Sequence, residues 1–106
     1  MNSTRLEALK KFLEDEPADP FNHYAVALEY AAQKEYATAI RGLERLIDLD
    51  PDYIPAYHQL ASMYSVQDRR VDAMGMFARG IGAATRVGDK HAGEEMREAL
   101  AELELE

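Results

Sequence analysis

The sequence predicts an all-α protein built from antiparallel helix hairpins, and two observations carry that prediction. Apolar residues recur at spacings of three and four along nearly the whole chain, and no stretch alternates with a period of two. Short polar or proline-containing breaks separate these stretches, which forces neighbouring helices to run antiparallel. We therefore expect about six helices and no sheet.

The first three expected helices are bounded by prolines and polar residues. The first stops before Pro17, and one of its faces consists of Leu6, Leu9, Phe12 and Leu13. Asp19 is the expected N-cap of the second helix, and Pro20 fits its first position because the missing N–H has no helical partner there. This helix should run to about Gln33, and after a polar break the third helix ends before Pro51.

The last three expected helices are delimited in the same way. The stretch Asp50-Pro51-Asp52 is expected to end the third helix and to cap the fourth, whose first turn accommodates Pro55. The fifth helix should span about Arg69 to Val87. Gly88-Asp89 then separates it from a sixth helix over residues 90–104.

Internal repetition favours a stack of hairpins over a closed bundle. Similar apolar and acidic residues precede Pro17 and Pro51. The shift that superposes these two prolines also pairs His23 with Tyr57, Val26 with Leu60, Ala27 with Ala61, Tyr30 with Tyr64, Ala39 with Ala73 and Leu43 with Phe77. A period of this length, about 34 residues, with paired helices is typical of tetratricopeptide repeats.

On these residues the chain resembles the tetratricopeptide repeat (TPR) family. The first repeat supplies the motif residues His23, Val26, Ala27, Tyr30, Ala39, Leu43, Leu46 and Pro51. The second supplies Tyr57, Leu60, Ala61, Tyr64, Ala73, Phe77 and Gly80. The sequence departs from the motif at His23, where a large aromatic residue is usual, and at Leu46, where a small residue is usual. Lys34 and Asp68 replace the glycine that normally ends the first helix of a repeat.

The resemblance implies a TPR-like α-solenoid, with residues 1–106 forming a single domain. Residues 1–17 would be the N-terminal half-repeat helix, residues 20–53 and 54–87 two full repeats, and residues 90–104 a C-terminal capping helix. Small residues let two helix backbones approach where they cross. The alanines expected to be buried at such crossings are Ala27, Ala39, Ala61 and Ala73.

Three glycines fall inside the fifth expected helix, namely Gly75, Gly80 and Gly82. Each costs about 1 kcal/mol relative to alanine within a helix. One interpretation is that the sixth helix, or a partner, approaches closely at these positions. The other is that they are tolerated weak positions in a frayed helix.

The charge balance argues against two classes of partner. The 106 residues include 20 acidic and 12 basic side chains, which gives a formal net charge of −8. A negative field repels phosphate backbones and anionic lipid surfaces, so we expect no nucleic acid and no membrane as partner. The chain has no cysteine and no apolar run near the roughly 20 residues of a membrane-spanning helix, which suits a cytoplasmic protein.

Residue patterns typical of catalytic or metal sites are missing from the sequence. The three histidines, His23, His58 and His91, have no metal-ligand spacing, so we expect no metal site and no cofactor. Ser62 and Ser65 have no base at a suitable spacing, and the paired carboxylates fall on expected solvated faces. The protein is therefore not expected to be an enzyme, and a ligand carrier would need a pocket that six short helices hardly enclose.

In the TPR family, the first helix of each repeat lines the concave face. The matching residues are Phe21, Tyr24, Leu28, Ala31 and Ala32 in the first repeat and Pro55, His58, Ser62, Ser65 and Val66 in the second. The first set is unusually apolar for side chains that face solvent. It forms either an exposed groove for a partner segment or a surface covered by the neighbouring termini.

The resemblance and this apolar set predict a protein–protein interaction module that binds a peptide or helix of a partner protein in the concave groove. The expected partner-binding residues are Phe21, Tyr24, Leu28, Ala31, His58 and Ser62. The alternative is a self-associating structural protein that forms a homodimer through the same surface. Tyr24 and Leu28 occupy the positions of the lysine and asparagine with which some family members clamp C-terminal carboxylates, so that activity is not implied.

Overall fold

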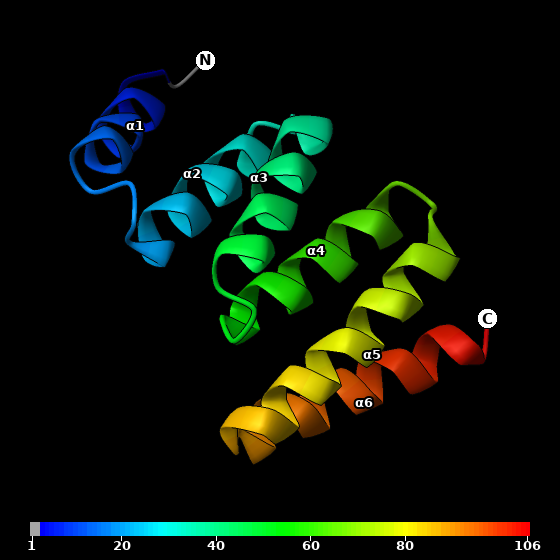
Figure 1. The fold of residues 1–106 in the computed structure, drawn as a ribbon. Coiled ribbons are helices and arrows are strands. Elements are labelled where there is room, and N and C mark those ends of the chain that lie inside the picture. Colours follow the sequence, from blue (N-terminus) through cyan, green and yellow to red (C-terminus); the bar gives the residue numbers. More distant parts are fainter. Residues whose placement is uncertain (1–2) are drawn as a thin grey trace. The chain divides into compact units, whose positions relative to one another are not determined.

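A computed structural model describes residues 3–106, and within that range it contains six helices and no strand (Figure 1). The helices are α1 (Ser3–Asp15), α2 (Pro20–Ala32), α3 (Tyr36–Leu49), α4 (Ile54–Val66), α5 (Arg70–Val87) and α6 (Lys90–Glu104). The predicted all-α class and the number of helices are confirmed. The helices fall into two compact units, one with α1 to α3 up to Asp50 and one with α4 to α6 from Pro51 onward.

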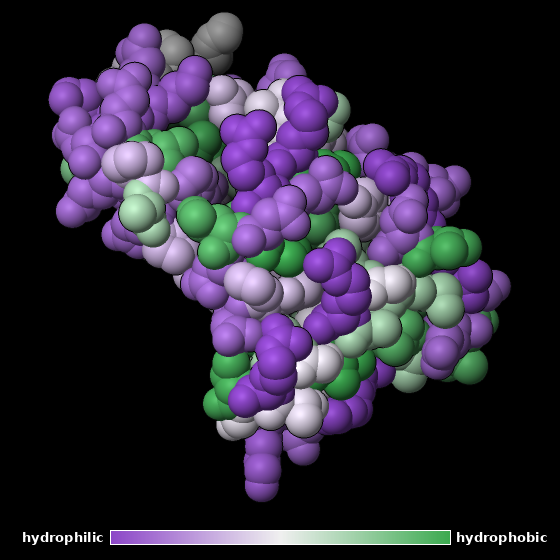
Figure 2. Space-filling model, viewed as in Figure 1, coloured by the Kyte–Doolittle hydropathy of each residue, from purple (hydrophilic) through white to green (hydrophobic). Residues whose placement is uncertain are grey.

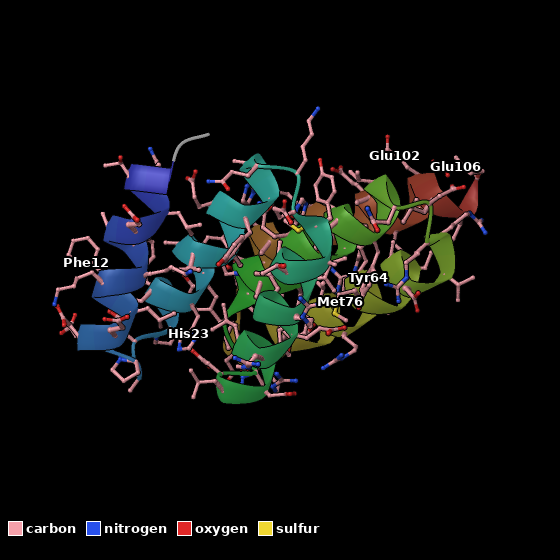
Figure 3. All side chains as sticks on the ribbon, turned by 90° about the horizontal axis from the view of Figure 1, so that it is seen from above. Phe12, His23, Tyr64, Met76, Glu102 and Glu106 are labelled. Atoms are coloured by element: carbon pink, nitrogen blue, oxygen red, sulfur yellow. The ribbon has the colours of Figure 1, made fainter. Side chains whose placement is uncertain are left out.

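In the first unit, α2 packs against both α1 and α3. The buried apolar side chains of this unit are Val26, Ala27, Ala39, Ile40, Leu43, Leu46 and Ile47. A Cβ atom on Gly42 of α3 would lie 3.5 Å from the Cβ atom of Ala27, so α2 and α3 cross where both side chains are small. Phe12, which spacing groups with Leu6, Leu9 and Leu13 on one face of the first helix, is 58% exposed and lies on the side of α1 away from α2 (Figure 3).

In the second unit, α5 packs against both α4 and α6. The largest fully buried side chains here are Leu60 of α4 and Met96 of α6, each contributing about 1.5–3 kcal/mol to stability by its removal from water. Gly93 of α6 is also buried, with its would-be Cβ atom 3.6 Å from Ala84 of α5. The four alanines predicted at helix crossings, Ala27, Ala39, Ala61 and Ala73, are all buried.

The two proline links are held by equivalent hydrogen bonds. The Tyr57 hydroxyl donates to the carbonyl oxygen of Pro51 at 2.5 Å. His23, the equivalent residue of the first repeat, has its Nε2 atom 2.6 Å from the carbonyl oxygen of Pro17. A ring nitrogen thus replaces the phenolic hydroxyl, and this accounts for the departure from the aromatic motif at His23.

Three helices end in the same left-handed turn. Lys34 after α2 has a φ of 64°, Asp68 after α4 has 61°, and Gly88 after α5 has 78°. The hydrogen bonds that close these ends run from Glu35 N to Tyr30 O, from Arg69 N to Tyr64 O and from Asp89 N to Ala84 O. This is the Schellman pattern, in which glycine is favoured because a Cβ atom is strained at positive φ.

One of the predicted N-caps is confirmed and one is wrong. The Asp19 side chain accepts a hydrogen bond from the backbone N–H of Phe21 at 3.0 Å, as predicted. Asp52 does not cap α4, because the N-cap position is Tyr53, which makes no side-chain capping bond. Asp52 instead accepts from the Arg86 guanidinium at 2.8 Å, and this hydrogen bond raises the pKa of Arg86 above its usual value.

The glycines of α5 have different surroundings. A Cβ atom on Gly80 would lie 2.5 Å from the Met96 sulfur and 2.8 Å from the Tyr57 Cβ atom. The expected close approach of the sixth helix is therefore confirmed at Gly80, where α4 approaches as well. Gly75 and Gly82 have nothing within 4 Å of such an atom, so the expected approach of the sixth helix is wrong for these two positions.

Replacing these glycines by alanine should have opposite effects. Gly80→Ala should reduce the free energy of unfolding by about 1–3 kcal/mol, because the Tyr57 Cβ atom cannot move without its backbone. Gly82→Ala, the matched control in open space, should increase it by up to about 1 kcal/mol. Urea unfolding of both variants measures the difference, and destabilisation of equal size in both would contradict the close approach of α4 to α5 at Gly80.

Glycine at the two strained helix ends should stabilise the protein. Lys34→Gly should raise the free energy of unfolding by about 0.5–1 kcal/mol, because it removes the Cβ atom at positive φ. Asp68→Gly should raise the free energy of unfolding by less than Lys34→Gly does, because aspartate tolerates the left-handed conformation better than lysine. Lys34→Ala controls for loss of the charged side chain, and chemical denaturation showing the same gain for Lys34→Ala would rule out backbone strain as the cause.

Candidate functional site

An open groove of about 580 Å³ lies between α1 and α2 in the first unit. From α1 it is lined by Arg5 and Leu9. From α2 it is lined by Phe21, Tyr24, Ala25, Leu28, Glu29 and Ala32. The structure thus brings together three of the side chains predicted to bind a partner, Phe21, Tyr24 and Leu28.

The groove follows one stripe of α2, and the protein core uses another. Residues spaced by three and four share one side of a helix, which places Phe21, Tyr24 and Leu28 together. Val26 and Ala27 lie on a different side of α2 and are buried. Helix α2 therefore has two apolar stripes, and only one of them is fully used by the folded unit.

The large apolar side chains that α2 contributes to the groove differ in exposure. Phe21, in its first turn, is 59% exposed, whereas Tyr24 and Leu28 are half-buried. Leu9, which faces them from α1, is also half-buried. Helix α1 thus forms one wall of the groove and leaves the Phe21 ring accessible to solvent.

A hydrogen-bonded ion pair forms the polar part of the groove. Arg5 Nε lies 2.9 Å from Glu29 Oε1, and the Gln33 side-chain amide donates to Glu29 Oε2 at 3.3 Å. Glu29 is only 9% exposed, so both carboxylate oxygens are satisfied where water has little access. The Arg5 side chain is 71% exposed, and its remaining N–H groups are turned to solvent.

The other predicted site residues lie elsewhere. Ala31 is half-buried on α2 and is not among the residues that line the groove, whereas Ala32 is. His58 and Ser62 belong to α4 in the second unit, where both are half-buried. The His58 ring packs edge-on against Phe77, with the ring centroids 5.6 Å apart.

Sequence reasoning did not identify the polar part of the groove. Glu29 follows Ala25 by four residues, so an acid on an otherwise apolar stripe was the available signal. Arg5 precedes Leu9 by four residues and therefore lies on the same side of α1. The pair itself depends on how closely α1 approaches α2, which the local sequence does not encode.

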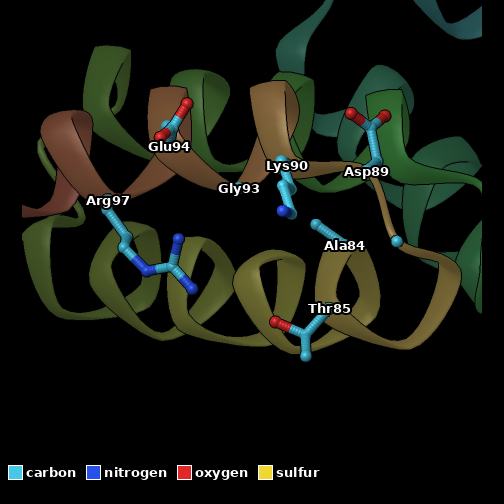
Figure 4. A pocket seen from close by; sticks show the side chains of 8 residues that line it. Ala84, Thr85, Asp89, Lys90, Gly93, Glu94 and Arg97 are labelled. Carbon is cyan, nitrogen blue, oxygen red and sulfur yellow. The ribbon is translucent and has the colours of Figure 1, made fainter.

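The second unit contains two shallow pockets in which charges are already paired or mixed. One, of about 380 Å³, lies between the end of α5 and the start of α6 and contains Lys90 and Arg97 together with Asp89 and Glu94 (Figure 4). The other, of about 580 Å³, contains the ion pair of Arg86 and Asp52.

Residues 3–106 contain neither a metal-binding cluster nor a helix suited to crossing a membrane. No group of three or more histidine, cysteine or acidic side chains there is arranged to hold a metal ion. Within the same residues, no helix combines the length and apolar character that crossing a membrane requires. Hydrophilic residues dominate the face of the molecule in Figure 2, with hydrophobic patches between them.

No protein-family model matches the chain, and no curated protein is significantly similar to it. Solved structures do match. A solution NMR structure of a tetratricopeptide repeat domain protein from Salinibacter ruber is 34% identical, with a TM-score of 0.80, over 84% of this chain and 90% of that one. A crystal structure of a tetratricopeptide repeat domain protein from Salinibacter ruber is 35% identical, with a TM-score of 0.77, over 83% of this chain and 100% of that one.

A more distant structure shares the fold. The TPR2B domain of yeast Sti1, solved in a complex with pHsp70, has a TM-score of 0.86 at 16% identity, over 94% of this chain and 80% of that one. The sequence similarity to the Salinibacter ruber protein extends over more than four fifths of the chain and includes both predicted repeats. This chain belongs to the tetratricopeptide repeat family.

Proposed function

We propose that this protein is an interaction module that seats an apolar peptide or helix of a partner protein in the α1–α2 groove. The observation that carries the proposal is the exposed Phe21 ring beside half-buried Tyr24 and Leu28 in one groove. An apolar groove with a polar edge is the usual form of a site for a peptide or an amphipathic helix.

The apolar surface that a ligand can still bury in the groove is small, which favours a reversible complex. Removing a fully exposed apolar side chain from water contributes about 1.5–3 kcal/mol. Phe21 is more than half exposed, whereas Tyr24 and Leu28 have less surface left to bury. Part of the gain is offset by the entropy cost of association, so we expect moderate affinity rather than tight binding.

The Arg5–Glu29 pair gives the groove a means of orienting its ligand. The guanidinium has five N–H donors in a planar fork, and Glu29 engages only one edge of it. A carbonyl or carboxylate oxygen of the ligand can accept from the exposed edge while apolar side chains fill the groove. A protein of this fold binds a partner in the Sti1 TPR2B complex with pHsp70, which supports the class of function.

Truncating the groove should separate binding from folding. Phe21→Ala should change the free energy of unfolding by less than about 1 kcal/mol, because its side chain is more than half exposed. Tyr24 is half-buried, so Tyr24→Ala should lower that free energy more than Phe21→Ala does. Val26→Ala, on the buried stripe of the same helix, is the matched control and should cost more than Phe21→Ala. Peptides selected on the parent protein from a random library should lose binding to Phe21→Ala and keep it with Val26→Ala. Binding is measured by fluorescence anisotropy.

Two results would contradict this function. One is a set of selected peptides that bind Phe21→Ala and Tyr24→Ala as tightly as the parent protein. The other is severe unfolding of both groove variants with no change in association. Light scattering across a concentration range tests the homodimer alternative, which requires a dimer mass in the parent protein and a monomer mass in Phe21→Ala.

A further inference from the structure

We propose that a second pocket of the first unit, on the buried-stripe side of α2, binds an acidic side chain of a polypeptide ligand. This cationic pocket lies among α1, α2 and α3 and has a volume of about 190 Å³. Its polar lining consists of His23, Tyr30, Thr38, Arg41 and Arg45. None of its lining residues belongs to the α1–α2 groove.

The two cations that line the pocket, Arg41 and Arg45, both come from α3. Arg41 and Arg45 are one turn apart on α3, so their side chains share one side of that helix. Lys10 of α1 lies over the Tyr30 ring, with its Nζ atom 5.9 Å from the ring centroid. His23 adds a ring from α2. No acidic residue lines the pocket, although the chain as a whole carries a net charge of −8.

The two pocket arginines differ from the three arginines of the described residues that form ion pairs. Arg5, Arg69 and Arg86 each form an ion pair with a carboxylate. Within residues 3–106, neither Arg41 nor Arg45 has a carboxylate within 4 Å, and the Arg41 guanidinium donates only a long hydrogen bond to Thr38 Oγ1 at 3.4 Å. Like charges at this spacing destabilise a helix by about 0.2–0.5 kcal/mol, so an anion between them would stabilise the unit.

The corresponding pocket of the second unit contains a carboxylate. Arg79, one repeat after Arg45, lies over the Tyr57 ring in a pocket that also holds Asp52, and Asp52 is bound by Arg86. The residue one repeat before Asp52 is Ala18, which has no charge, so the first unit has no carboxylate at that repeat position.

The size and walls of the pocket select the kind of anion. A volume of about 190 Å³ has room for a carboxylate with its short methylene stem. Buried Val26 and Ala27 form an apolar wall for that stem. Arginine binds carboxylates in a bidentate geometry, and the net negative charge of the protein opposes a long polyanion such as nucleic acid.

The test is a titration of the ¹⁵N-labelled full chain with a short oligoglutamate peptide, followed by NMR. Chemical-shift changes should centre on the amides of Thr38, Gly42 and Arg45. Arg45→Gln should raise the Kd of the peptide about tenfold, because the variant loses a charge-assisted hydrogen bond to the ligand carboxylate. Lys11→Gln is the matched control, because it removes one positive charge from an exposed ion pair outside the pocket and should leave the Kd within about twofold. Arg41→Gln is a second pocket variant should Arg45→Gln perturb the fold.

Several outcomes would overturn the proposal. Equal weakening by Arg45→Gln and Lys11→Gln would show diffuse attraction rather than a site. Chemical-shift changes confined to residues outside the pocket would also show that the peptide does not bind at this site. Inorganic phosphate that reproduces the shifts would assign the pocket to a free oxyanion, and tighter binding of a single-stranded oligonucleotide at the same residues would assign it to nucleic acid. Phe21→Ala should leave oligoglutamate binding unchanged, so this test and that of the groove can fail separately.

Discussion

The close crossing of paired helices is the constraint on which the rest of the structure depends. Two helix backbones can approach only where the side chains between them are small. Gly42 meets Ala27 between α3 and α2, and Gly80 meets the Tyr57 Cβ atom between α5 and α4. With the backbones this close, large side chains on either side of each crossing, such as Leu43, are removed completely from water.

The same constraint gives α2 its two roles. Because Ala27 brings α2 close to α3, one stripe of α2 is fully occupied by the core of the first unit. The stripe with Phe21 and Leu28 faces the groove beside α1 instead and is only partly covered. The groove and the cationic pocket therefore lie on different sides of one helix, and one unit of the protein has both a largely apolar groove and a pocket lined by two arginines.

Local patterns in the sequence predicted what depends on one helix, and failed where two segments meet. The six helices, the buried alanines and the Asp19 cap follow from spacing and cap chemistry, and the structure has all of them. The Asp52 cap was wrong because Arg86, near the end of α5, binds that carboxylate. Spacing on α2 placed Phe21 beside its groove neighbours, whereas the Arg5–Glu29 pair could not be predicted without knowing how α1 lies on α2.

The most direct test of the crossing constraint is the free energy of unfolding of Ala61→Leu, measured in urea beside Ala78→Leu. Ala61 is fully buried on α4, whereas Ala78 is exposed on α5 and receives the same added atoms. Ala61→Leu should lower the free energy of unfolding by about 1–3 kcal/mol, because the larger side chain has no space there. Ala78→Leu should change it by no more than about 0.5 kcal/mol. An Ala61→Leu protein as stable as the parent would contradict the crossing constraint.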